Sequence, residues 1–375
     1  MKKYFVLFSV CTIAVFNFSC GPKPNFSTDQ TQRMDALITM AMTNYKVPGV
    51  IAAVWVPDKG TWIKATGYAD KTTGQAMDPN MLFRIASASK TFTVRVILNL
   101  VQEGKLSLDD TIDKYITDPI IPNAHNITIR QVANMTSGLF EYTDDQTYLD
   151  MKKENPLYVW TPKEQIELAL THTPYFAPGT SWHYSNTNYI ILGLIIEKIT
   201  GNSVITEIQN RIIIPLGLSK TSFATTPKMP PNSSHGYSLS NTADENSMFD
   251  STVIDPSCAW TAGAIISNIY DLKMWAQEFG TGSLISSNLY KEQLTWIDEP
   301  GVTLPFKYGL GTMRVGNFIG HEGSIDGFNI SMMYLPSNGA VFIVVLNLEP
   351  GLQGNLADGV FAQLAKIVLP NDVSW

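Results

Sequence analysis

Apolar residues recur with two different periods along this chain, and each period predicts a different kind of element. Residues 31–45 place a stripe of apolar side chains on one helical face: Met34, Leu37, Ile38, Ala41, Met42 and Tyr45. Pro48-Gly49 ends that helix, and "VIAAVWV" (50–56) then has the unbroken apolar character of a buried strand. After the turn "PDKG", "TWIKATGYAD" (61–70) predicts the returning strand of a hairpin.

A second β-rich block lies toward the other end of the chain. Four strand-like runs are separated by Gly, Asn, Pro and Ser: "YGLGTMRV" (308–315), "NFIGHEG" (317–323), "FNISMMYL" (328–335) and "AVFIVVLNL" (340–348). The clearest hairpin turn between them is "PSNG" (336–339). A closing helix is predicted from its apolar side: Leu356, Val360, Phe361, Leu364 and Val368.

The middle of the chain is predicted to be mostly helical. Residues 91–104 carry Val94, Ile97, Leu98 and Val101 at helical spacing, and Gly104 suits the position just past a helix end. Four more segments favour helices: 162–171, 187–201, 203–214 and 268–279. Residues 226–258 are polar and rich in Pro, Ser and Asn, and they are too long for an ordinary loop, so we expect them to be functional or mobile.

Strands at both ends with helices between them predict an α/β (α+β) fold. Short turns imply an antiparallel sheet, and the two ends of the chain must meet to complete it. We therefore expect one catalytic domain over 31–375, with a sheet region at about 31–86 and 285–375 and a mostly helical lobe inserted at about 87–284. A cleft between sheet and lobe is a favoured place for a site.

Composition excludes several classes of protein. The 375 residues are 45% hydrophobic, which suffices for a large core, and the net charge is -7 without any Lys/Arg cluster, so no nucleic-acid partner is expected. The five histidines lack the spacing of a zinc site, and we expect neither a metal nor a cofactor. Three cysteines do not suggest disulfides; Cys258 is expected to be a small buried residue.

The first residues have the pattern of an export signal. Lys2 and Lys3 precede an apolar run that is shorter than the about 20 residues a spanning helix needs, and the run stops at Cys20. The segment resembles a bacterial lipoprotein signal, although Asn17 stands where leucine is usual. We expect a signal peptide at 1–19, a linker at 20–30, and an exported cell-envelope protein held on the membrane by lipid at Cys20. Plain cleavage nearby and an uncleaved anchor are the alternatives.

The stretch "RIASASK" (84–90) raises the question of catalysis. Ser87 and Lys90 are three residues apart at the start of a predicted helix, so their side chains can meet on one face. A serine hydroxyl needs a neighbouring base, and a lysine whose ammonium is disfavoured by burial can help to supply one. Alone the pair carries little weight, since roughly one match is expected by chance in such a chain. Ser89 falls on another face and is expected to be local polar filler.

Two further motifs occur once each, after the first in the chain. Tyr184-x-Asn186 lies in "HYSN", and His321-x-Gly323 lies in "GHEGS". With Ser87-x-x-Lys90 they resemble the three motifs of the serine penicillin-recognising enzymes, in the branch of class C β-lactamases, DD-carboxypeptidases and related esterases. Segments such as "NMTSGL" and "PGTSWHYSNTNYIILGLIIEKITG" extend the likeness over roughly residues 31–369. The resemblance implies a β-lactamase/transpeptidase-like fold.

The same resemblance implies a role for each matched position. Ser87 would be the nucleophile, Tyr184 the general base, and Lys90 the cation that eases their ionisation. Asn186 would bind the substrate amide. The third motif would also contact the substrate, through His321, Glu322, Gly323 and Ser324. The backbone N–H groups of Ser87 and Ser324 would form the oxyanion hole.

One position departs from the family pattern. Glu322 stands where a threonine often helps to bind the substrate carboxylate, and a carboxylate there repels it. The sequence thus predicts a serine hydrolase acting on amide or ester bonds of a small molecule or peptide, nominally a DD-carboxypeptidase-like enzyme with peptidoglycan fragments or β-lactams as partners. An esterase or D-amino-acid amidase is one alternative, and a catalytically silent surface binding protein is the other.

Overall fold

The protein is described by a computed structural model that covers residues 25–239, 248–298, 306–349, 351, 354–373 and 375. The expected signal peptide and residues 20–24 of the expected linker, Cys20 among them, lie outside the described residues, and so do residues 240–247 of the long polar segment. The helix expected at 31–45 begins three residues earlier, since α1 spans Thr28–Tyr45. Ser27 caps it, and its side chain accepts the Gln30 N–H.

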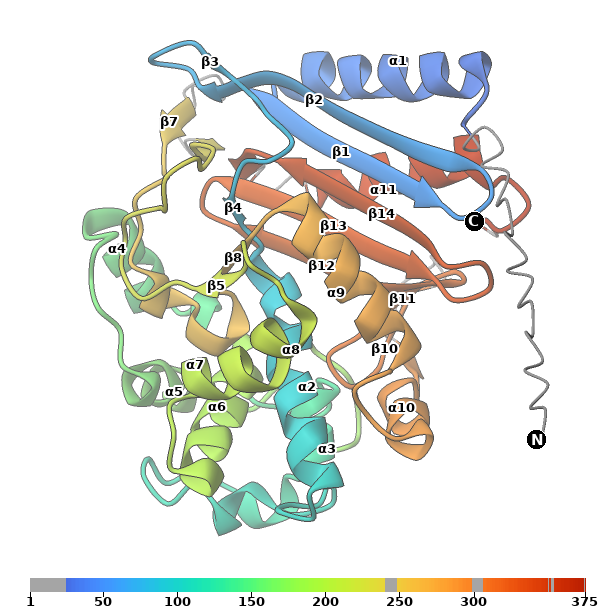
Figure 1. Cartoon of the computed structure of the whole chain (residues 1–375). Helices are drawn as coiled ribbons and strands as arrows, with labels where there is room; N and C mark the ends of the chain where they lie inside the picture. The colour runs from blue at the N-terminus through green and yellow to red at the C-terminus, as the bar shows by residue number, and fades with distance from the viewer. Residues whose placement is uncertain (1–24, 240–247, 299–305, 350, 352–353, 374) are drawn as a thin grey trace, which may run out of the picture.

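The central sheet is built from both ends of the chain, as predicted (Figure 1). Its nine strands stand in the order β3-β2-β1-β14-β13-β12-β11-β10-β9. Their bounds are β1 Gly49–Val56, β2 Gly60–Asp70, β3 Gln75–Ala76, β9 Ile297–Asp298, β10 Phe306–Tyr308, β11 Met313–Val315, β12 Phe318–Ile325, β13 Phe328–Leu335 and β14 Ala340–Leu346. Every pairing is antiparallel, and Val50 lies opposite Leu346 where β1 joins β14.

Helices cover both faces of this sheet. On one face, α1 and α11 (Leu356–Val368) pack together, and Val50, Ala52 and Val54 of β1 point into the core layer beneath them. On the other face, the alternate residues Ile51, Ala53 and Trp55 meet the core that α9 (Ile269–Thr281) and the lobe share. The lobe predicted at about 87–284 included the residues of α9. In the structure, α9 instead packs on β13 and β14 of the sheet (Figure 1).

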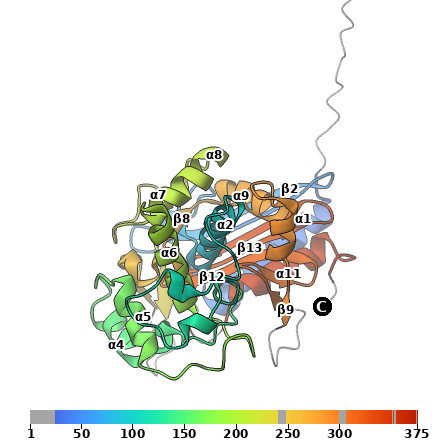
Figure 2. The ribbon, with the colours of Figure 1, turned by 90° about the horizontal axis from the view of Figure 1, so that it is seen from below.

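The inserted lobe lies below the sheet in Figure 1, and Figure 2 shows it from its far end. The remaining helices are α2 Ser89–Gln102, α3 Ile129–Ala133, α4 Gln146–Glu154, α5 Pro162–Leu170, α6 Asn186–Thr200, α7 Val204–Ile208, α8 Ile214–Leu216 and α10 Ser287–Gln293. Two small sheets accompany them, formed by β4 Phe83–Arg84, β8 Ile265–Ser267 and β5 Ser222–Phe223, and by β15 Leu348–Glu349, β6 Tyr237–Leu239 and β7 Met248–Asp250.

Three expected elements differ in detail. The single strand predicted at 308–315 is two strands, β10 and β11, because a tight turn at Gly309–Thr312 separates them and Gly311 there has φ 57°. The helix predicted at 203–214 is α7 followed by a π-helical turn and α8. The polar segment 226–258 is not one loop, because β6 and β7 pair within it.

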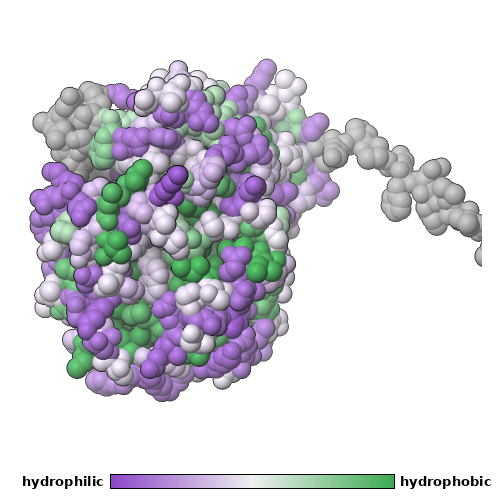
Figure 3. Space-filling view, turned by 60° about the vertical axis from the view of Figure 1, so that its left-hand side comes forward, coloured by the Kyte–Doolittle hydropathy of each residue, from purple (hydrophilic) through white to green (hydrophobic). Residues whose placement is uncertain are grey.

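The surface of the described residues is mixed in character. Figure 3 shows a face on which hydrophilic residues surround separate hydrophobic patches. No described helix alone has the length and hydropathy of a membrane span, although α6 and Val204–Leu216, bent by 83°, meet that criterion together by length and composition.

Candidate active site

Ser87 lies in a short 3₁₀ turn, Ala86–Ala88, between β4 and the first residue of α2. Ala86 has φ 48°, a left-handed conformation that is unusual for alanine and that turns the chain sharply before the serine. Ser87 remains partly exposed. Ser89 is not the polar filler that the sequence suggested: it is fully buried, and its Oγ accepts the Ile265 N–H at 3.1 Å, which ties α2 to β8.

Lys90 lies beneath Ser87 and is fully buried. Its Nζ donates to Ser87 Oγ at 2.9 Å, to Asn186 Oδ1 at 2.6 Å and to the Ala262 carbonyl at 2.9 Å. These acceptors use all three protons of an ammonium. Burial nevertheless lowers the pKa of Lys90 to about 7, so the amine can change its protonation state near neutral pH.

Tyr184 lies next to this pair, at the entrance to α6. Lys90 Nζ is 4.9 Å from the centre of its ring, and the Ser87 side chain lies close enough to its phenol to affect the pKa of that phenol. Burial raises the pKa of Tyr184 well above its ordinary value. Of the two groups, Lys90 is the one whose pKa lies near neutrality, and the expected role of Tyr184 as general base stays a prediction.

Glu141 is a site residue that the sequence did not single out. It is buried, and it accepts the backbone N–H groups of Asn186 and, at 3.0 Å, Thr143. Burial raises the pKa of Glu141, and its carboxylate in turn raises the pKa of Lys90. The only sequence signal was an acid in the otherwise apolar and aromatic stretch "GLFEY".

The third motif approaches Ser87 through its backbone. A Cβ built on Gly323 would lie 2.6 Å from the Ile85 carbonyl and 3.0 Å from the Ser87 nitrogen, so only glycine allows this contact. The Glu322 N–H points away from β13, toward Met313. Because strand N–H groups alternate in direction, the Ser324 N–H points to the same open edge of β12. This direction suits the expected oxyanion hole.

His321 does not contact the cleft, contrary to expectation. It is fully buried, Nδ1 donates to the Glu322 carbonyl at 2.6 Å, and Nε2 accepts the Tyr308 hydroxyl at 3.0 Å. Burial lowers the pKa of His321 to about 3, so the ring is neutral and cannot offset the charge of Glu322. The structure makes His321 a support for β12 rather than a substrate contact.

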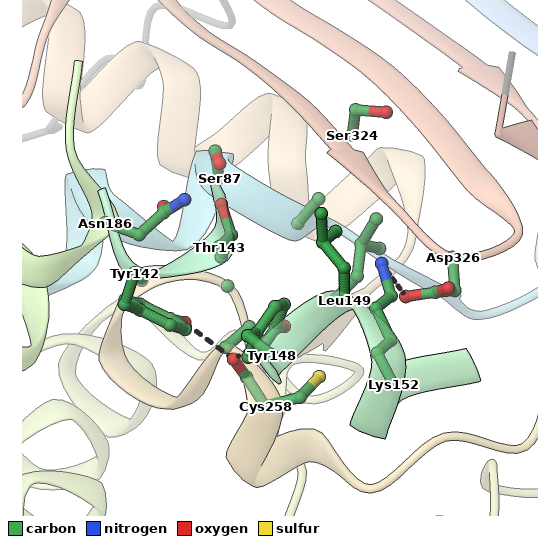
Figure 4. Close-up of a pocket in the computed structure, with 15 residues that line it drawn as sticks. Ser87, Tyr142, Thr143, Tyr148, Leu149, Lys152, Asn186, Cys258, Ser324 and Asp326 are labelled. Carbon is green, nitrogen blue, oxygen red and sulfur yellow. Dashed lines mark hydrogen bonds and ion pairs between the residues drawn. The ribbon is translucent and has the colours of Figure 1, made fainter. Parts of the chain in front are cut away.

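Two cavities adjoin residues of this site, and Ser87 lines the first of them. The first, here the α4 cavity, has a volume of about 200 Å³ and is lined by Ser87, Asn186, Ser324, Tyr142, Tyr148 and Leu149 among others. Figure 4 shows Lys152 of α4 meeting Asp326 across it, in an ion pair of 2.9 Å. Cys258 also lines this cavity, and burial raises the pKa of its thiol to about 12. As expected, it is small, buried and unsuited to nucleophilic attack.

The second cavity, here the α11 cavity, has a volume of about 530 Å³ and lies beside Tyr184. Glu322 and Asp358 line it, together with the aromatic residues Trp182, Phe306, Phe361 and Trp375. Across the described ranges, no three His, Cys, Asp or Glu residues stand close enough to hold a metal ion. The groups that the structure brings together at Ser87 are a lysine, a tyrosine and backbone donors.

Most of this chain is similar to known proteins. The family model described as Beta-lactamase matches residues 34–366. A D-stereospecific amidohydrolase from Streptomyces sp. is 29% identical, with a TM-score of 0.78 over 88% of this chain and 97% of that one. D-amino acid amidase from Ochrobactrum anthropi SV3, complexed with D-phenylalanine, is 25% identical, with a TM-score of 0.79 over 92% of this chain and 98% of that one. Protein flp of Staphylococcus aureus (strain NCTC 8325 / PS 47) is 26% identical over 90% of this chain and 67% of its own length.

Proposed function

Because the chain belongs to the beta-lactamase family and is a serine hydrolase of that family, we propose that it cleaves amide or ester bonds through an acyl-enzyme on Ser87. The observation that carries this proposal is the contact of Ser87 Oγ with Lys90 Nζ at 2.9 Å, beside Tyr184 and the open edge of β12. This arrangement of side chains and backbone supplies a nucleophile, a proton acceptor and oxyanion donors at one place.

The proposed reaction has two halves. Ser87 Oγ attacks the substrate carbonyl carbon while its proton passes to neutral Lys90, and the N–H groups of Ser87 and Ser324 stabilise the oxyanion. The bond to the leaving group breaks, and that group takes a proton through the Tyr184 hydroxyl. A water molecule then attacks the acyl-enzyme, gives a proton to the same relay, and releases the acid and free Ser87.

The charge of the α11 cavity guides the choice of substrate. Glu322 and Asp358 line it, and its described lining residues include no Lys, Arg or His, although Lys90 lies near enough for the Glu322 carboxylate to raise the pKa of its amine. A leaving group with a carboxylate, such as the terminal D-alanine of a DD-carboxypeptidase substrate, would face like charge. We therefore propose that amides and esters of D-amino acids, which the two similar solved enzymes suggest by their names, are better substrates than D-Ala-D-Ala peptides.

A substrate panel on the purified protein tests this proposal. The panel contains a D-amino-acid amide and its L-enantiomer, a neutral ester, a D-Ala-D-Ala peptide and benzylpenicillin, and kcat/KM is measured for each. We expect the amide or ester to exceed the peptide by at least about tenfold. Preference for the D-Ala-D-Ala peptide would instead support the carboxypeptidase, and binding without turnover of any substrate would support a silent surface protein.

A further inference from the structure

The α11 cavity begins at the reacting centre, because Tyr184 forms part of its wall. Its volume of about 530 Å³ exceeds what an ammonia leaving group needs and lies within the range of small-molecule pockets. Its remaining walls come from β10, β11, β12 and α11, with Trp182 and Trp375. A cavity of this size beside the proton donor is a place for a bulky leaving group.

Aromatic side chains make up much of the lining. They are Trp182, Tyr184, Phe306, Phe361 and Trp375. Ring faces attract cations, and they also bury the apolar stem that carries a cation. Aromatic rings alone would accept a neutral group equally well, so the acids beside them decide the sign of the charge that fits.

Two acids reach this cavity from different elements. Glu322 comes from the middle of β12, and Asp358 comes from the first turn of α11. Asp358 Oδ1 is buried and has no hydrogen-bond partner among the described residues, and the same holds for Trp375 Nε1. Burial raises the pKa of Asp358 to about 6, although the nearby Ser331 hydroxyl opposes the shift. A buried carboxylate oxygen without a donor is costly, and a positive charge in the cavity beside it would lower that cost.

We propose that the α11 cavity binds a bulky leaving group that carries a positive charge, so that the preferred substrates are amides of aromatic or aliphatic diamines. The inference rests on the proposed function, since it names the leaving-group side of the same reaction. The distal ammonium lies among the rings and the two carboxyl groups, while the scissile nitrogen lies at Tyr184. Cleavage breaks the C–N bond, and the departing nitrogen takes the proton that Tyr184 donates.

The test holds the acyl group constant and varies only the leaving amine. D-Phenylalanine is coupled to ammonia, benzylamine, 4-(aminomethyl)benzylamine and 4-(aminomethyl)benzoic acid, which gives small, neutral, cationic and anionic leaving groups. We expect kcat/KM to rank cationic above neutral above anionic, with at least about tenfold between the extremes. An equal or inverted ranking among the three benzylamine derivatives would overturn the inference.

Variants then assign the effect to the cavity. Glu322→Gln and Asp358→Asn should each reduce the cationic-to-anionic ratio several-fold, whereas Glu167→Gln, an exposed acid of α5 that lines neither cavity, should preserve it. If Asp358→Asn does not fold, inhibition by free 4-(aminomethyl)benzylamine, compared between wild type and Glu322→Gln, gives the same information. An unchanged ratio in both acid variants contradicts the proposal.

Failure of this inference is distinguishable from failure of the proposed function. An enzyme that forms an acyl adduct on Ser87 with all four amides but ignores the charge of the leaving group keeps the proposed function and loses only the inference. Absence of any Ser87 adduct with these amides and with the neutral ester would overturn both.

Discussion

At the scale of single residues, the burial of Lys90 is the feature on which the chemistry depends. Full burial lowers the pKa of its amine to about 7, and the three acceptors hold it directly under Ser87. Tyr184 lies beside Ser87 and has a raised pKa, so it is suited to pass a proton on rather than to remove one first. In the proposed mechanism, the two side chains therefore serve one proton transfer.

A double-mutant cycle tests this shared role. Lys90→Ala and Tyr184→Phe should each slow acylation by at least about a hundredfold, and the double variant should be little worse than the poorer single variant. Single-turnover acylation rates with a chromogenic ester measure all three, and circular dichroism checks that each variant is folded. Penalties that add fully would show that the two residues act independently.

Glu141 affects the pH range in which Lys90 works, although burial has the larger effect on the pKa of that amine. Its carboxylate raises the pKa of the amine, so Glu141→Gln should lower that pKa. Because neutral Lys90 is the active form, activity rises with pH through this pKa, and the acid limb of the kcat/KM profile should move to lower pH in the variant. Glu167→Gln, on the exposed side of α5, should leave the limb in place. If the acid limb of the kcat/KM profile lies at the same pH or at a higher pH in Glu141→Gln, this electrostatic role is contradicted.

Motif spacing predicted some site residues and could not predict others. Ser87 and Lys90 are three residues apart, so helix geometry alone brings them together. Glu141 and Asn186 are 45 residues apart, and nothing local marks their contact. The position of His321 was predicted, but its orientation was not, because burial and the Tyr308 hydrogen bond are tertiary facts.

At the scale of elements, the site depends on how closely β12 passes the turn that carries Ser87. Gly323 is the contact point, and no side chain fits between it and Ile85. Gly323→Ala should therefore push β12 away, widen the oxyanion hole, and reduce acylation by about a hundredfold or more. Acylation rates and thermal unfolding measured together check this, and wild-type acylation in a folded variant would show that the close approach is unimportant.

Elements that contain many patterned apolar positions were predictable from the sequence, and elements of two or three residues were not. The hairpin of β1 and β2 and the helix α11 carry five or more patterned positions each. The strands β4, β5 and β8 have two or three residues, too few to show alternation, and they form only because the lobe folds against the sheet. The turn that separates β10 from β11 could not be predicted either, because it lies within a run that has the composition of a single strand.

At the scale of the whole molecule, the two ends of the chain close the sheet on which the site rests. That the two ends meet in one sheet was predictable, because a buried strand needs a neighbour on each edge, and β1 and β14 are the strands that join them. The site then lies where the sheet meets the lobe that interrupts it. Neither the size of the two cavities nor the acids in the α11 cavity could be foreseen, since they depend on how the layers pack.

The location of the molecule is a separate prediction from sequence. We propose that the protein is exported and tethered by lipid on Cys20. Expressed in a bacterial host with its own first residues, wild type should partition into the detergent phase, and Cys20→Ser should shift to the aqueous phase or remain unprocessed. Cys258→Ser is the matched control and should partition like wild type. Equal partitioning of wild type and Cys20→Ser would contradict lipidation.

The most direct measurement is the mass of the protein after reaction with a fluorophosphonate and with a slowly hydrolysed ester, followed by mapping of the modified peptide. We expect one adduct per chain on Ser87, and we expect Ser87→Ala, although folded, to form no adduct and to lose turnover by several orders of magnitude. An adduct on Ser89 or Cys258, or turnover that persists in Ser87→Ala, would contradict it.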